Sequence, residues 1–114
     1  MIYLSLSVSN IEDTIFFYTK ALGIFDSIAD TRLICNTEVE LIIDLFEIGN
    51  EAHQNTFGID THAPSNMSIS QDCDVIAEHL KEFDIPYEFK TNIAGEFLKV
   101  LDPTENIISF IGGQ

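Results

Sequence analysis

The sequence predicts an α+β fold made of two βαβββ modules with mixed sheets that curl around a cavity. Each half of the 114-residue chain begins with a strand-like alternation, continues with a helix-like apolar stripe and ends in short β-rich runs. Val8 precedes Ile24 by 16 residues, and Ile69 precedes Ile85 by 16 residues, so the two halves repeat the same spacing. A chain of this length is typical of one domain, which we expect to span residues 1–114.

The first module is expected over residues 1–46. Residues 2–9 alternate between apolar and polar side chains, as in a half-buried strand. Asn10 can cap a helix that runs to about Leu22, and Gly23 stands where a left-handed C-terminal cap belongs. Residues 24–28, 32–35 and 38–46 then predict three strands, separated by turn-prone residues.

The second module is expected over residues 65–114, after a linker at 47–64 that is rich in turn residues and lacks sustained periodicity. A strand over 66–70 leads to a helix whose stripe is Ile76, Leu80 and Phe83. Three strands follow at 87–90, 95–101 and 106–111. The last two are joined by a turn in which Pro103 presets the backbone φ angle.

Composition excludes several classes of function. Nineteen acidic against five basic residues give a formal charge of −14, which disfavours binding to nucleic acid or to anionic membranes. No apolar run approaches the roughly 20 residues of a membrane-spanning helix, and the N-terminus lacks the features of an export signal, so a cytoplasmic location is expected. Cys35 and Cys73 are far apart, without zinc-ligand spacing, and we interpret both as reduced thiols.

Two stretches carry a resemblance to a known family. Residues 8–24, VSNIEDTIFFYTKALGI, resemble the opening signature of the glyoxalase/bleomycin resistance/dioxygenase (vicinal oxygen chelate) superfamily, through Phe17-Tyr18 and Leu22-Gly23. The turn after residue 101 resembles the closing signature, through Asp102, Pro103 and Asn106. The resemblance implies paired βαβββ modules around a cavity, often in a homodimer that assembles the complete sites, and we expect a homodimer here.

The chain departs from the family at the positions where the enzymes bind a divalent ion. The resemblance places these ligands at Tyr3, at Pro64 or Ser65, and at Ser109. None is a good ligand, because proline has no donor, a serine hydroxyl is a weak neutral donor, and tyrosine would have to lose a proton of pKa about 10. The sequence therefore predicts no metal and no other cofactor.

A relocated metal site is the alternative that the sequence leaves open. His62 lies two or three residues before the second ligand position, and Glu40 or Asp44 lies in the strand that corresponds to the last. The commoner role of such residues is solvent exposure. His79 is expected to pack or hydrogen-bond at the surface of the second helix, and His53 to lie in the linker; neither indicates catalysis.

Two functions follow from these patterns. The first is a binding protein that sequesters a small molecule, with a cationic or aromatic guest favoured by the net charge and by aromatic side chains near the predicted cavity. The alternative is a metal-dependent lyase, isomerase or dioxygenase with relocated ligands. Small polar and aromatic residues are the predicted ligand-binding set: Tyr3, Ser5, Ser7, Phe57, Asn66, Ser68, Phe97 and Ser109. No catalytic residue is predicted, and a non-enzymatic role is favoured.

Overall fold

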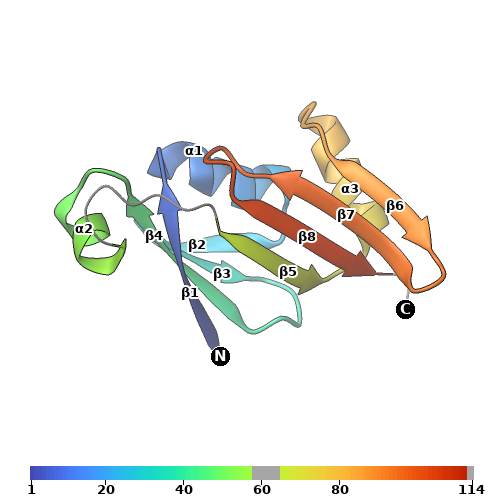
Figure 1. The fold of residues 1–114 in the computed structure, drawn as a ribbon, viewed down its shortest axis with the longest axis horizontal. Coiled ribbons are helices and arrows are strands. Elements are labelled where there is room, and N and C mark those ends of the chain that lie inside the picture. The colour runs from blue at the N-terminus through green and yellow to red at the C-terminus, as the bar shows by residue number, and fades with distance from the viewer. Residues whose placement is uncertain (58–64, 113–114) are drawn as a thin grey trace.

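The computed structural model describes residues 1–57 and 65–112, and it confirms the predicted α+β architecture of two βαβββ units. The two sheets are mixed, four-stranded and not closed, and they lie side by side along the long axis of the molecule (Figure 1). Both have the same strand order, in which the first strand pairs in parallel with the last and the other two follow antiparallel. The repeat in the sequence is therefore a repeat of topology.

Sheet A is formed by the first half of the chain. Its strands, in spatial order, are β1 (Ile2–Val8), β4 (Leu41–Glu47), β3 (Arg32–Cys35) and β2 (Phe25–Ala29). The helix between β1 and β2 begins as α1 (Ile11–Phe16), capped by the Asn10 side chain, which accepts a hydrogen bond from the Asp13 amide at 2.9 Å. It continues as a wider π-helical turn, η1 (Phe17–Ala21), closed by a bond from the Leu22 amide to the Phe17 carbonyl.

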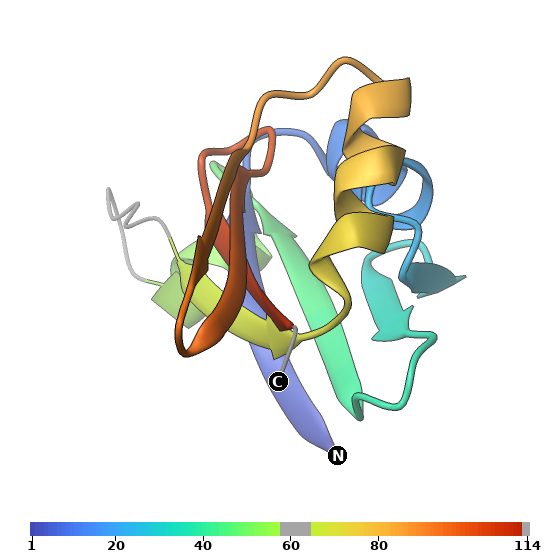
Figure 2. The ribbon, with the colours of Figure 1, turned by 90° about the vertical axis from the view of Figure 1, so that its right-hand side faces the viewer.

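Sheet B is formed by the second half. Its strands, in spatial order, are β5 (Asn66–Ser70), β8 (Ile107–Gly112), β7 (Gly95–Leu101) and β6 (Glu88–Asn92). The helix α3 (Cys73–Glu82) begins at Asp72, whose side chain accepts a hydrogen bond from the Asp74 amide at 3.0 Å. Figure 2 shows α3 on one side of sheet B, next to α1.

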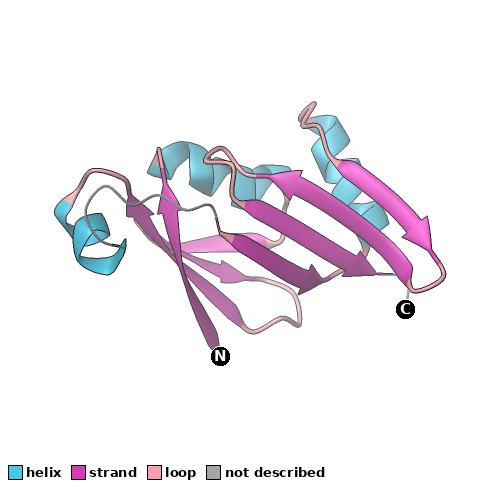
Figure 3. Ribbon diagram, viewed as in Figure 1, coloured by secondary structure: helices cyan, strands magenta, loops and turns pink. Residues whose placement is uncertain are grey.

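Helix α2 (Glu51–Phe57) occupies part of the segment that the sequence predicted to be an irregular linker. Its first turn is stabilised by Asn50, whose side-chain oxygen accepts a hydrogen bond from the His53 amide at 2.8 Å. Only seven residues long and mostly polar, it offers no apolar stripe that a periodicity argument could detect. It lies apart from the other helices, at one end of the molecule (Figure 3).

One continuous apolar core joins the helix-facing sides of both sheets. Alternate residues of β1 and β8, such as Leu6, Val8, Ile108 and Phe110, are buried against the helices, and their neighbours point to the opposite face. None of the described helices is long and apolar enough to span a bilayer.

Candidate functional site

The face of each sheet that points away from the core carries most of the predicted ligand-binding residues. Strand alternation places Tyr3, Ser5 and Ser7 on this open face of sheet A. The same rule places Asn66 and Ser68 on the open face of sheet B. Phe97 and Ser109 belong to that face too, and the predicted set is therefore divided between two sheets.

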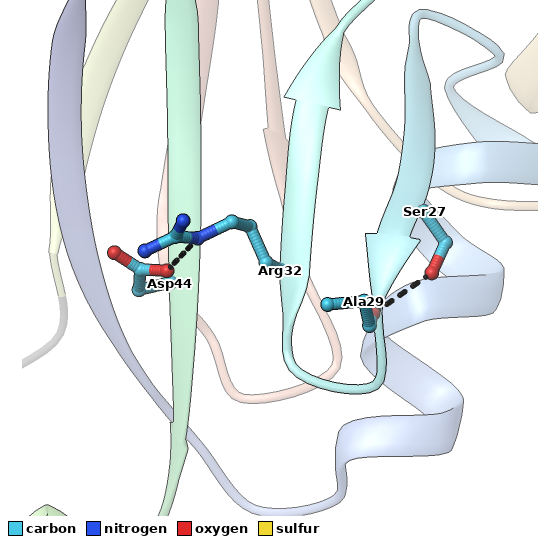
Figure 4. Close-up of polar contacts among 4 residues, drawn as sticks. All are labelled: Ser27, Ala29, Arg32 and Asp44. Atoms are coloured by element: carbon cyan, nitrogen blue, oxygen red, sulfur yellow. Dashed lines mark hydrogen bonds and ion pairs between the residues drawn. The ribbon is translucent and has the colours of Figure 1, made fainter.

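On sheet A, an ion pair dominates the surface next to Tyr3. Arg32 Nε of β3 donates to Asp44 Oδ1 of β4 at 2.6 Å, and Figure 4 shows the guanidinium reaching across to the carboxylate. The guanidinium carbon lies 5.9 Å from the centroid of the Tyr3 ring, within range of a cation–π contact. The Tyr3 side chain itself is 62% exposed. In the same view a bond from Ser27 Oγ to the Ala29 carbonyl, at 3.1 Å, steadies the end of β2.

At the other end of β1, Ser7 is buried beneath helix α2. Its Oγ lies 2.7 Å from His53 Nε2, and both side chains are less than 4% exposed. The two groups form a hydrogen bond that anchors α2 on the open face of sheet A. Ser7 is thus part of the structural support of this face, and His53, expected in an irregular linker, is a buried helical residue.

On sheet B, Phe97 and Ser109 meet in a hollow of about 200 Å³. Its other side-chain contributors are Glu88 and Lys90 from β6 and Lys99 from β7. The strand register explains the grouping, because Glu88 pairs with Lys99, Lys99 with Ser109, and Lys90 with Phe97. Neither lysine belongs to the predicted binding set, which holds small polar and aromatic residues.

Among the described residues, one group of acidic side chains brings its oxygens within 4.8 Å of one another: Asp72, Asp74 and Glu96. It lies at the start of α3 and at the start of β7, away from the positions where the resemblance expects metal ligands. Asp72 already serves as the helix cap, and both aspartates are exposed.

At the positions where the resemblance expects metal ligands, Tyr3 and Ser109 are not side chains that fit a divalent ion. Tyr3 is exposed beside the Arg32–Asp44 ion pair, and its phenol would have to lose a proton before it could bind a metal ion. Ser109 pairs with Ser68 across β5 and β8, so these two side chains offer only neutral hydroxyls. Of the residues considered for a relocated site, Asp44 is paired with Arg32, Glu40 lies 3.8 Å from the N-terminal ammonium group, and His62 lies outside the described residues. Pro64, one option for the second family position, lies outside them too.

Three of the residues that carried the family resemblance, Tyr18, Asp102 and Asn106, belong to a buried hydrogen-bond network between the two modules. Tyr18 Oη donates to Asp102 Oδ2 at 3.0 Å, and Asn106 Nδ2 donates to the same oxygen at 2.9 Å and to the Ser7 carbonyl at 3.1 Å. Asp102 Oδ1 accepts from the backbone amides of Thr104 and Asn106, each at 2.8 Å. Burial and the neighbouring Asp102 carboxylate both raise the pKa of Tyr18 well above its usual value.

Further contacts tie the end of the first strand and the two helices into this arrangement. The Ser9 amide donates to Thr104 Oγ1 at 2.9 Å, and His79 Nδ1 donates to the Leu22 carbonyl at 2.8 Å. Gly23 follows with φ +74°, and a β carbon there would lie 2.8 Å from His79 Nδ1. These residues therefore position the sheets instead of lining a ligand site. His79 makes the surface hydrogen bond that its helical position predicted.

Of the predicted binding set, the structure brings Phe97 and Ser109 together and places Ser68 beside Ser109 on the next strand. Tyr3, Ser5 and Ser7 lie on the other sheet, with Ser7 covered by His53. Phe57 ends α2, and its side chain lies outside the described residues. Asn66 is exposed at the start of β5.

Comparison with solved structures identifies the fold. A glyoxalase/bleomycin resistance protein from Streptomyces sp. CB03234 superposes with a TM-score of 0.74 at 18% identity, covering 96% of this chain and 97% of that one. TnmS3, an antibiotic binding protein from the same source, gives 0.72 at 18% identity, covering 100% and 96%. Lactoylglutathione lyase from Agrobacterium tumefaciens gives 0.72 at 12% identity, covering 99% and 92%. No family sequence model matches the chain.

Proposed function

We propose that this chain, which has the fold of the glyoxalase/bleomycin resistance/dioxygenase proteins, binds a small organic molecule without a metal ion and acts by sequestering it. The observation that carries the proposal is the chemistry at the expected metal positions. There the chain has Tyr3 and Ser109, and the Arg32 guanidinium lies next to Tyr3. These two side chains can hold an organic guest through their hydroxyls and the aromatic ring, and neither is a carboxylate or an imidazole, the usual protein ligands of such metal ions.

Two further observations support a binding role. The open face of sheet B has a hollow lined by an aromatic ring, a hydroxyl and charged side chains, a mixture typical of small-molecule sites. One structure of similar fold is that of an antibiotic binding protein. The Phe97 and Tyr3 rings support an aromatic guest, because they can stack on it. A cationic guest is supported only by the net charge of −14.

Assembly and location belong to the same proposal. In the described sheets β1 and β5 are edge strands, and the open faces keep exposed polar side chains such as Ser5 on sheet A and Ser68 on sheet B. We therefore propose a homodimer, in which a second copy covers these faces and encloses the guest. A cytoplasmic location follows from the sequence argument and agrees with two buried, unpaired thiols at Cys35 and Cys73.

The experiment that separates binding from metal enzymology is elemental analysis of protein purified without chelators. We expect far less than one equivalent of nickel, zinc, manganese or iron per chain. The alternative, a metal-dependent lyase, isomerase or dioxygenase with relocated ligands, requires near-stoichiometric metal that is lost when His62 is replaced by alanine. Such a result would overturn the metal-free proposal.

Sequestration is tested by calorimetry against a panel of small aromatic compounds, both cationic and anionic. The bound compound is then recovered and analysed by mass spectrometry. Sequestration predicts saturable binding with the ligand returned unchanged. Chemical conversion of the ligand would point to an enzyme, and absence of binding across the panel would remove the binding role.

A further inference from the structure

Cationic side chains gather around an aromatic ring in the hollow on the open face of sheet B. Lys90, Phe97 and Lys99 line it, together with Ser109 and Glu88. Because Lys90 is paired with Phe97, and Phe97 is two residues from Lys99, the lysines occupy diagonal positions on adjacent strands. Such positions are about 7–8 Å apart, so both ammonium groups can reach one small ligand that lies over the ring.

The charge of this hollow is opposite to that of the protein as a whole. The chain has five basic residues and a net charge of −14, yet the hollow holds two lysines and one glutamate. Arg32 is already paired with Asp44 at 2.6 Å, whereas neither Lys90 nor Lys99 takes part in an ion pair within the described residues. Glu88 lies directly opposite Lys99 and offsets one of the two positive charges, so one positive charge remains in the hollow for an anionic ligand to neutralise.

The remaining surface acids do not prevent an anion from binding here. At physiological salt the Debye length is about 8 Å, so carboxylates on distant loops and helices are largely screened from the hollow. Charged groups inside the hollow act at much shorter range. Glu88 pairs across the strands with Lys99, and its carboxylate opposes a second negative charge on the ligand. The local balance therefore favours a monoanion over a dianion.

Size and surface chemistry narrow the ligand further. A volume of about 200 Å³ lies below the range of about 300–1,000 Å³ that suits drug-sized ligands. The half-buried Phe97 ring can pack on a planar apolar group, and the Ser109 hydroxyl can donate a hydrogen bond.

We propose that this hollow binds a small aromatic carboxylate. Lys90 and Lys99 hold the carboxylate, Phe97 packs on the ring and Ser109 donates to a carboxylate oxygen. This assignment rests on the proposed small-molecule function and adds the class of ligand. The local charge of the hollow favours an anion, whereas the net charge of the whole chain favours a cation.

The test compares three probes of one shape by calorimetry at physiological salt: 2-naphthoate, 2-naphthylmethylammonium and 2-naphthylmethanol. We expect 2-naphthoate to bind most tightly. Lys90→Gln and Lys99→Gln should each weaken its binding by about fivefold, the size of an exposed charge pair. Lys81→Gln is the matched control, because it removes the same charge from the exposed side of α3 and should leave the affinity unchanged.

The outcomes separate this inference from the proposed function. The carboxylate site would be overturned if 2-naphthoate did not bind, or if Lys99→Gln and Lys81→Gln weakened its binding equally. Binding of the ammonium probe alone would overturn it as well, while the small-molecule function would stand. A loss confined to Lys90→Gln and Lys99→Gln, with far-ultraviolet circular dichroism unchanged, would support the site.

Discussion

Replacing Asn106 with alanine tests whether the buried network holds the two modules together. The Asn106 side chain is fully buried and makes three hydrogen bonds. Its Nδ2 donates to the Ser7 carbonyl of β1 and to Asp102 Oδ2, and its Oδ1 accepts from the Ser65 amide at 2.8 Å. Two of these bonds go to backbone groups at the ends of separate elements, so the alanine variant loses contacts in both halves of the chain.

The magnitude follows from counting those bonds. Each contributes about 1 kcal/mol net, which gives about 3 kcal/mol for the three. The loss rises to about 5 kcal/mol if the Ser65 amide stays buried without a partner. Domains have a total stability of about 5–15 kcal/mol, so such a loss removes at least about a fifth of the free energy of unfolding and nearly all of it at the low end of that range.

Urea unfolding followed by far-ultraviolet circular dichroism measures this loss as a lower midpoint at unchanged m. Asn36→Ala is the control, because the Asn36 side chain makes an exposed hydrogen bond to Asp26 at 3.2 Å. We expect the control to change stability by less than about 0.5 kcal/mol. An Asn106→Ala variant within about 1 kcal/mol of the parent protein would refute the reasoning.

Three other predictions concern single side chains. Burial and a nearby carboxylate raise the pKa of Tyr18, so the folded state holds the phenol proton more tightly than the unfolded state does. The free energy of unfolding should therefore fall above about pH 10, where the unfolded phenol ionises. Urea titrations at successive pH values should show a smaller fall in the Tyr18→Phe variant. Gly23→Ala should lower the free energy of unfolding, measured by calorimetry, by about 2–3 kcal/mol, because alanine is strained in the left-handed conformation and its β carbon displaces His79. In Gly49→Ala no atom lies within 4 Å of the new β carbon, so only the backbone strain should lower stability. Cys73 is fully buried and its pKa is raised by burial, so it should react with a disulfide reagent at neutral pH only at the rate of unfolding.

The fold could be predicted because its signals are local. Alternation in residues 2–8, the Asn10 cap and the left-handed Gly23 each report a backbone conformation that a few neighbouring residues determine. Helix α2 escaped prediction, since seven mostly polar residues show no period and its attachment depends on the contact between His53 and Ser7. That contact joins residues 46 positions apart, and no local pattern encodes it.

The set of ligand-binding residues stays a prediction. Two of its members, Phe97 and Ser109, lie in one hollow, because strand alternation puts both on the open face of sheet B. Lys90 and Lys99 were not expected there, because their proximity depends on the register between β6 and β7, which a single sequence does not reveal. Asp102 had matched a family motif, and its role in joining the modules became visible only when its partner Tyr18, 84 positions away, was located.

The buried network also makes the two halves chemically unequal despite their shared topology. The turn between β7 and β8 carries Asp102 and Asn106 at its ends, but the corresponding turn between β3 and β4 runs from Asn36 to Glu40 and is exposed at both. Two copies of the first half could therefore not reproduce the junction found here. An ancestral duplication would have had to acquire this interdependence afterwards, and neither half could then be exchanged without redesigning the other.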